Sequence, residues 1–188
     1  MHNYIKLDRL LKNPVYEKAR TSNVKKHAVE ILRDGGVIGI KAERCKRSLF
    51  YFMQTFWECV SNDQPQWNWH ISFLCSELEF LARRVANGEP KLHDLIINIP
   101  PGTTKSTTCT IMFPVWCWIN WSWMRFIAGA YSGALALEHA EYSRDLVKSE
   151  KFRQYFPNLE IKQDKDAKSN FRVQYHNDDG TTHTSIDL

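Results

Sequence analysis

Residues 102–107, Gly-Thr-Thr-Lys-Ser-Thr, carry side chains that are suited to holding phosphate groups. Lys105 would bring a positive charge to β- and γ-phosphate oxygens, and Ser106 would supply a hydroxyl oxygen of the kind that Mg²⁺ accepts. The apolar run 95–99 and two prolines precede this segment, and a long apolar stretch follows it. Strand, turn, Lys-Ser and helix in that order are typical of a phosphate-binding P-loop.

The segment departs from the standard P-loop pattern, which is Gly, four residues and then Gly-Lys-Ser/Thr. Ile99 and Thr104 occupy the two glycine positions, and Gly102 lies between them. The position before the lysine often needs an unusual backbone conformation, which costs a β-branched residue free energy. Two alternatives remain from the motif alone: nucleotide binding, or an ordinary strand–turn–helix with a solvated lysine.

The flanking patterns predict an α/β fold, a P-loop NTPase with a mostly parallel sheet flanked by helices. Residues 95–99 and 125–130 are apolar runs typical of buried parallel strands, and a buried helix ending near Asn120 would connect them. Apolar residues at helical spacing predict further helices over 41–60, 71–85 and 133–149. Alternating residues around 178–180 predict a β-hairpin near the end of the chain.

Charge divides the 188-residue chain into two regions. Residues 1–47 hold 12 Lys/Arg against 5 Asp/Glu and form a predicted basic, helical N-terminal region. This arm either meets nucleic acid or is a solvated helical face. Residues 48–188 are predicted to form the P-loop domain, and a hydrophobic content of 43% for the whole chain is typical of a globular protein.

Two classes of protein are disfavoured by the sequence. The five cysteines form no Cys-x-x-Cys pair, which favours reduced core thiols over a zinc site or a disulfide framework. The Trp-rich stretch 109–124 contains Pro114 and Asn120 and falls short of about 20 clean apolar residues, so a buried helix is predicted there rather than a membrane span. The N-terminus has no apolar run of the signal-peptide type.

From about residue 50 to residue 179, the order of segments resembles the large terminase subunit of tailed phages. The resemblance is carried by 67–70 (Trp-Asn-Trp-His), 77–79, 95–101, Lys105-Ser106, 113–116, 130–136 and 143–145. It implies the ATPase part of a DNA-packaging motor, with ATP and Mg²⁺ as cofactors. Lys105 would be the catalytic lysine, and Ser106 would ligate Mg²⁺. The nucleotide would contact Gly102, Thr103, Thr104, Lys105, Ser106 and Thr107, and Trp69 and His70 would lie near the adenine.

The resemblance also implies partners and a location. The expected partners are double-stranded DNA, the portal protein, the small terminase subunit and further copies of the chain in a ring, with no membrane involved. The expected location is the bacterial host cytoplasm, at the procapsid portal during packaging.

An acidic pair for hydrolysis is missing from the expected place. ATP turnover needs one carboxylate for Mg²⁺ and a glutamate that orients the attacking water. Asp178 and Asp179 belong to the predicted hairpin turn, and Asp187 follows too short an apolar run. The sequence therefore predicts the front part of a terminase, ending before the acidic motif and the nuclease domain, that binds ATP weakly and hydrolyses it negligibly. The alternatives are another P-loop NTPase, such as a helicase or a small kinase, and an inactive remnant or DNA-binding module.

Overall fold

The computed structural model describes residues 36–166, 171–177 and 179–184. The chain divides into two compact units, residues 1–41 and 42–188. In the first unit the described residues, 36–41, are helical. The other helices predicted for the basic arm lie outside the described residues.

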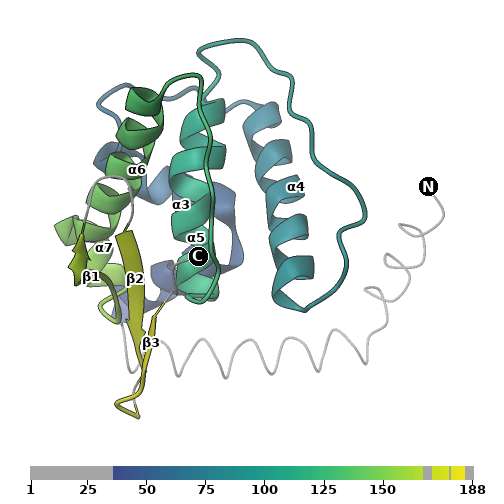
Figure 1. The fold of residues 1–188 in the computed structure, drawn as a ribbon. Coiled ribbons are helices and arrows are strands. Elements are labelled where there is room, and N and C mark those ends of the chain that lie inside the picture. Colours follow the sequence, from purple (N-terminus) through teal and green to yellow (C-terminus); the bar gives the residue numbers. More distant parts are fainter. Residues whose placement is uncertain (1–35, 167–170, 178, 185–188) are drawn as a thin grey trace, which may run out of the picture. The chain divides into compact units, whose positions relative to one another are not determined.

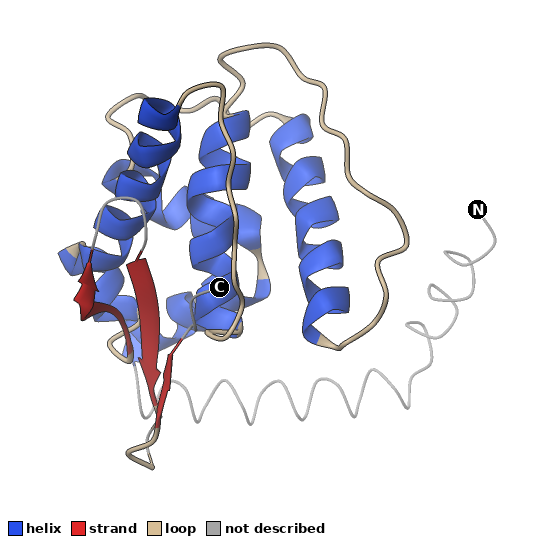
Figure 2. Cartoon of the chain, in the orientation of Figure 1, coloured by secondary structure: helices blue, strands red, loops and turns tan. Residues whose placement is uncertain are grey.

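Helices make up most of the regular structure of the second unit, as Figures 1 and 2 show. Residues 42–47 are helical, and the later elements are α3 (Leu49–Phe56), the 3₁₀ turn η1 (Trp57–Cys59), α4 (Trp69–Ala86), the π-helical segment η2 (Thr107–Met112), α5 (Phe113–Asn120), α6 (Gly133–Lys148) and α7 (Glu150–Tyr155). The helices predicted over 71–85 and 133–149 are confirmed, as is the helix ending at Asn120.

The prediction of one continuous helix over 41–60 is wrong, because Ser48 interrupts it. Ser48 has an extended backbone (φ −139°, ψ 120°), and its hydroxyl accepts a hydrogen bond from the Tyr51 N–H at 3.3 Å. A serine in this geometry is an N-cap, which begins a new helix at Leu49. The apolar spacing on either side is helical in both pieces, so periodicity alone did not reveal the break.

Glu79 of α4 connects that helix to the beginning of α3. One carboxylate oxygen accepts a hydrogen bond from the Leu49 N–H at 2.6 Å. Burial raises the pKa of Glu79, and the hydrogen bonds from the Leu49 N–H and the Ser48 side chain act against that effect. The first N–H of α3 therefore has an acceptor that lies 30 residues away in the sequence.

We expect Glu79→Ala to lower the free energy of unfolding by about 1–2 kcal/mol, because a helix N-terminus loses its acceptor. Glu79→Gln keeps an amide oxygen there and should retain most of that stability. A raised folded-state pKa means that the parent loses stability as pH rises through the interval just above 4.5, the ordinary pKa of glutamate. Glu79→Gln should lack this loss. Urea unfolding across that interval measures both effects, and identical pH profiles for the parent and Glu79→Gln would contradict the assignment.

Three antiparallel strands follow the helices: β1 (Leu159–Asp166), β2 (Phe171–His176) and β3 (Thr182–Thr184), in the order β1-β2-β3. Ile161 lies opposite Val173, and Tyr175 lies opposite His183. The turn between β2 and β3 has Gly180 at φ +84°, and the Asn177 N–H donates to the Thr181 carbonyl at 2.8 Å. The predicted hairpin is confirmed.

The predicted α/β fold with a mostly parallel sheet is wrong. Residues 95–99 and 125–130 belong to no strand ladder, and the described part of the chain contains only antiparallel strand pairing. Side chains of 95–99 alternate between half-buried and exposed, with Ile96 90% exposed, and residues 125–130 are all exposed. A strand of a parallel sheet is covered on both faces. Here each extended segment has at most one covered face, because the helices α4 to α6 pack around a core of their own.

Several large aromatic side chains belong to the core of the second unit. Trp116, Phe52, Phe56 and Phe152 are fully buried, and the rings of Phe56 and Phe152 lie 5.5 Å apart. Lys151 of α7 donates to the Thr55 carbonyl near the end of α3 at 2.5 Å and to the Glu58 carboxylate at 2.8 Å. These contacts hold α7 against α3. No helix among the described residues is long and apolar enough to span a membrane.

Candidate phosphate-binding turn

The turn before the helix has two residues at positive φ. Gly102 lies at φ +78° and Thr104 at φ +64°. The Thr103 hydroxyl donates to the Pro100 carbonyl at 2.6 Å, and this bond closes the turn. Lys105 is the first helical residue. The expectation that position 104 would need an unusual conformation is confirmed.

Thr104 is held in this conformation by Thr108, one helical turn later. The N–H and the hydroxyl of Thr108 both donate to the Thr104 carbonyl, at 2.8 and 2.9 Å. A β-branched residue at positive φ is a genuine outlier, and such strain persists only where the surroundings over-determine it. The buried hydroxyl of Thr104 has no hydrogen-bond partner in the described structure.

Three main-chain N–H groups at this helix start are available to a ligand. The first hydrogen bond onto the turn is donated by the Thr108 N–H, and within the described residues no partner is found for the N–H groups of Lys105, Ser106 and Thr107. Free N–H groups and the helix dipole together favour an anion at such a position. The side chains of Lys105 and Ser106 are exposed and have no ion-pair or hydrogen-bond partner in the described part of the chain.

Two other helices begin at the same end of the unit, which is the upper end in Figure 1. α4 begins there with Trp69, and α6 begins there with Ser132 as its N-cap, whose hydroxyl accepts from the Leu135 N–H at 3.2 Å. α4 and α6 both pack against η2. Aligned N-termini add their partial positive charges, so this end of the helices favours negatively charged ligands.

Trp69 and His70, predicted near the adenine, lie at the start of α4. Trp69 is 79% exposed, and its ring meets that of His70 edge-on at 6.2 Å. The buried Nε2 of His70 has no hydrogen-bond partner in the described structure. The structure therefore places both residues at the same end of the helices as the turn.

Two buried thiols, those of Cys75 and Cys109, lie on helices near the turn. Burial raises the pKa of Cys109 to about 11, and the positive charge of Lys105 acts against this rise. Burial also raises the pKa of Cys75 on α4 to about 12, with the charges of Glu79 and Cys109 adding to the effect. All five cysteines are free. These thiols stay protonated at neutral pH, as expected of buried cysteines that are neither metal ligands nor nucleophiles.

The chemistry around the turn fits a phosphate with Mg²⁺ better than it fits a metal held by protein alone. Among the described residues no group of three His, Cys, Asp or Glu side chains could hold a metal ion. Mg²⁺ typically keeps several waters and takes one or two protein oxygens plus phosphate oxygens, so the free hydroxyl of Ser106 is a suitable ligand. The Asp179 carboxylate instead accepts from the Thr181 N–H at 2.8 Å inside the hairpin, while Asp178 and Asp187 lie outside the described residues.

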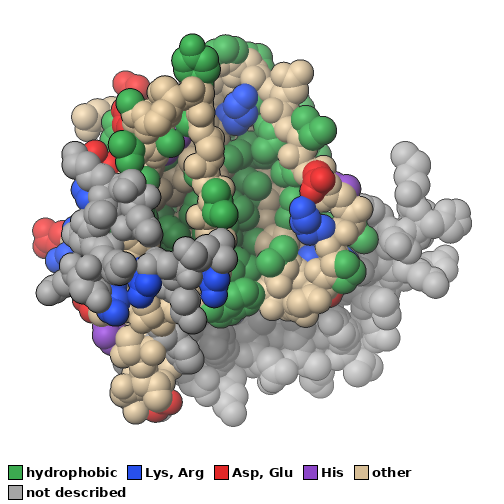
Figure 3. Space-filling view, viewed as in Figure 1, with side chains coloured by type: hydrophobic (Ala, Val, Ile, Leu, Met, Phe, Trp, Pro, Cys, Tyr) green, Lys and Arg blue, Asp and Glu red, His purple; other side chains and the backbone are tan. Residues whose placement is uncertain are grey.

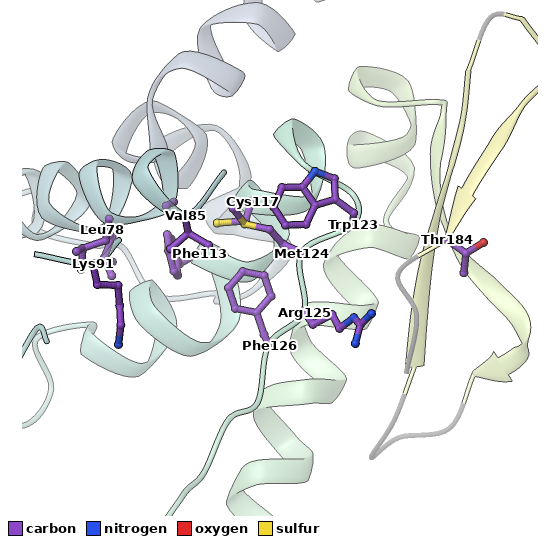
Figure 4. A pocket seen from close by; sticks show the side chains of 12 residues that line it. Leu78, Val85, Lys91, Phe113, Cys117, Trp123, Met124, Arg125, Phe126 and Thr184 are labelled. Atoms are coloured by element: carbon purple, nitrogen blue, oxygen red, sulfur yellow. The ribbon is translucent and has the colours of Figure 1, made fainter. Parts of the chain in front are cut away.

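A separate apolar cavity of about 830 Å³ opens between α4, α5 and the segment after α5. Figure 3 shows hydrophobic side chains in this hollow, and Figure 4 shows its lining, with Leu78 and Val85 from α4, Phe113 and Cys117 from α5, and Phe126. No residue of the turn lines it. The cavity is therefore distinct from the candidate phosphate site.

Sequence reasoning missed that Thr108 hydrogen-bonds to the turn and that Ser143 of α6 hydrogen-bonds to Ile111 in the helix after the turn. Both are almost completely buried polar residues. Ser143 belongs to the segment 143–145 of the resemblance, which predicted no contact for it, and no motif marks Thr108.

No protein-family model, curated protein or solved structure matches this chain.

Proposed function

We propose that residues 102–107 bind the phosphates of a nucleoside triphosphate together with Mg²⁺. The observation that carries this proposal is the left-handed Thr104 immediately before a helix whose first three N–H groups have no partner among the described residues. Lys105 would neutralise phosphate charge, Ser106 would ligate Mg²⁺, and the N–H groups of 105–107 would donate to phosphate oxygens. The proposal rests on this turn and not on a parallel sheet.

We further propose, from the order of the segments quoted above, that the chain is the ATP-binding part of a terminase-type motor that packages double-stranded DNA. On this proposal it acts in the bacterial host cytoplasm at the portal, as one subunit of a ring, together with the small terminase subunit. The basic region 1–47 would contribute to DNA binding. The ATPase of the motor would also need a carboxylate that orients the attacking water.

Calorimetric titration of the chain with a non-hydrolysable ATP analogue, with and without Mg²⁺, tests nucleotide binding. We expect weak, Mg²⁺-dependent binding, because Pro100 and Pro101 offer no N–H to a phosphate. A phosphate-release assay should show negligible turnover. An absence of heat at millimolar nucleotide would overturn the proposal. Robust turnover would make Asp178, Asp179 and Asp187 candidates for the catalytic carboxylates.

Replacing Thr104 by glycine should relieve strain without removing any ligand group. A left-handed conformation costs a non-glycine residue about 1–2 kcal/mol, whereas glycine adds about 0.5–1 kcal/mol of unfolded-state entropy. We therefore expect Thr104→Gly to raise the free energy of unfolding by about 0.5–1 kcal/mol, with nucleotide affinity equal or higher. Urea unfolding and the same titration measure these effects.

Thr103→Gly is the matched control, because Thr103 has no positive φ and donates to the Pro100 carbonyl. This variant should lose stability. If Thr104→Gly lost as much, position 104 would not be under strain in solution.

A further inference from the structure

The helix that carries Lys105 is widened to π-helical geometry over Thr107–Met112, where the Phe113 N–H donates to the Thr108 carbonyl five residues earlier. Pro114 follows at once. A proline inside a helix has no N–H, and its ring clashes with the carbonyl four residues before it. Widening the preceding turn relieves that clash, and such π segments recur at functional sites.

Ser143 of α6 contacts this π segment. Its side chain is buried at 3% exposure, and its hydroxyl lies 3.0 Å from the Ile111 carbonyl, to which it donates. The same hydroxyl lies 3.1 Å from the His139 carbonyl of its own helix. A helical serine commonly donates to the carbonyl four residues earlier. Since one hydroxyl has one proton, the carbonyls of Ile111 and His139 share or compete for it.

The π segment is in turn hydrogen-bonded to the phosphate turn. Thr108, in the same segment, donates twice to the Thr104 carbonyl, at 2.8 and 2.9 Å. A change from π to α geometry between residues 107 and 112 would shift the register by one residue. It would rotate Lys105 and Ser106 by about 100° and move them by about 1.5 Å relative to α5. The direction of the free N–H groups therefore depends on the π geometry.

We propose that Ser143 is a positioning residue for the phosphate turn: its hydrogen bond to the Ile111 carbonyl holds the π register that aims the N–H groups of 105–107. This inference deepens the proposed function and, for its effect on nucleotide affinity, rests on it. α6 and the turn are thereby coupled, because a displacement of α6 removes the bond that keeps the register.

Hydrogen exchange of the ligand-free chain, read by mass spectrometry, tests the positioning role without any nucleotide. In Ser143→Ala we expect amides of residues 108–113 to exchange at least about tenfold faster, with the amides of α4 unchanged. Ser76→Ala is the matched control, because the Ser76 hydroxyl donates only to the carbonyl of Ser72, four residues earlier on α4. It should leave 108–113 unchanged. Ser143→Cys keeps the volume and a weak donor, and should fall between the parent and Ser143→Ala.

The nucleotide titration on the same variants completes the test. We expect Ser143→Ala to bind the Mg²⁺–ATP analogue about 5- to 10-fold more weakly than the parent, and Ser76→Ala to bind equally well. Uniformly faster exchange in all helices would show a merely structural serine and overturn the proposal, as would unchanged exchange at 108–113. Should Ser143→Ala fail to fold, Ser143→Cys carries the same comparison. If the parent binds no nucleotide while exchange at 108–113 responds as expected, the proposed function fails and the positioning role stands.

Discussion

Replacing Lys105 by alanine removes nucleotide binding from this chain, on our proposal, without unfolding it. The Lys105 side chain is exposed and has no described partner, so its loss should change the free energy of unfolding by less than about 0.5 kcal/mol. A charge-assisted contact to phosphate contributes about 1.5–3 kcal/mol, which corresponds to roughly a 10- to 100-fold weaker affinity. Because the parent is expected to bind nucleotide weakly, calorimetry should detect no nucleotide binding to the variant.

Lys91→Ala is the matched control for Lys105→Ala. Lys91 is also exposed and loses the same charge, but it pairs with Asp94 at 2.7 Å and lies outside the turn. Its removal should leave nucleotide affinity unchanged within about twofold. If both variants bound equally well, or lost affinity equally, the phosphates would not lie at Lys105.

The largest loss of stability is expected at Trp116. This side chain is fully buried, and its indole N–H donates to the Cys45 carbonyl at 2.8 Å across 71 positions of the sequence. Its ring also meets Trp121 edge-on at 5.8 Å. Truncating such a residue to alanine costs about 3–5 kcal/mol, a large fraction of the 5–15 kcal/mol that typically stabilises a domain.

Trp116→Phe separates the contribution of the buried ring to stability from the contribution of the hydrogen bond. It keeps much of the apolar volume but leaves the Cys45 carbonyl without its donor, so we expect a loss of about 1–3 kcal/mol. Trp69→Ala, at a 79% exposed position, should change the free energy of unfolding by less than about 0.5 kcal/mol. Urea unfolding followed by far-ultraviolet circular dichroism measures all three. A loss below 1.5 kcal/mol in Trp116→Ala would contradict a core centred on this residue.

Local chemistry was predictable from the sequence where a short segment decides its own conformation. The turn at 102–104, the helix beginning with the Lys-Ser pair, the amphipathic helix containing Ile71 and Leu78, and the hairpin at Gly180 all depend on neighbours within a few residues. The helices and the hairpin follow the backbone preferences of their residue types, whereas the turn was predicted from the motif, because Thr104 adopts a positive φ that its type disfavours. The conformation of the turn could therefore be predicted, whereas the packing of the elements around it could not.

Pairing between distant segments was not predictable in the same way. Residues 95–99 have the composition of a buried strand but belong to no strand, because composition does not supply a partner strand. The contacts of Glu79 with Leu49 and of Ser143 with Ile111 join residues 30 and 32 positions apart. Common polar residues make these contacts, and nothing in the neighbouring sequence distinguishes them from solvent-facing ones.

The extended segment 125–130 has a consequence for handling the protein in solution. Its main-chain groups form no described ladder, and Ile127 is 88% exposed. An uncovered, extended and apolar stretch of backbone is a template onto which another chain can add by edge-to-edge pairing. We therefore expect this surface segment to promote self-association in concentrated samples, and Ile127→Lys to reduce it without changing the core.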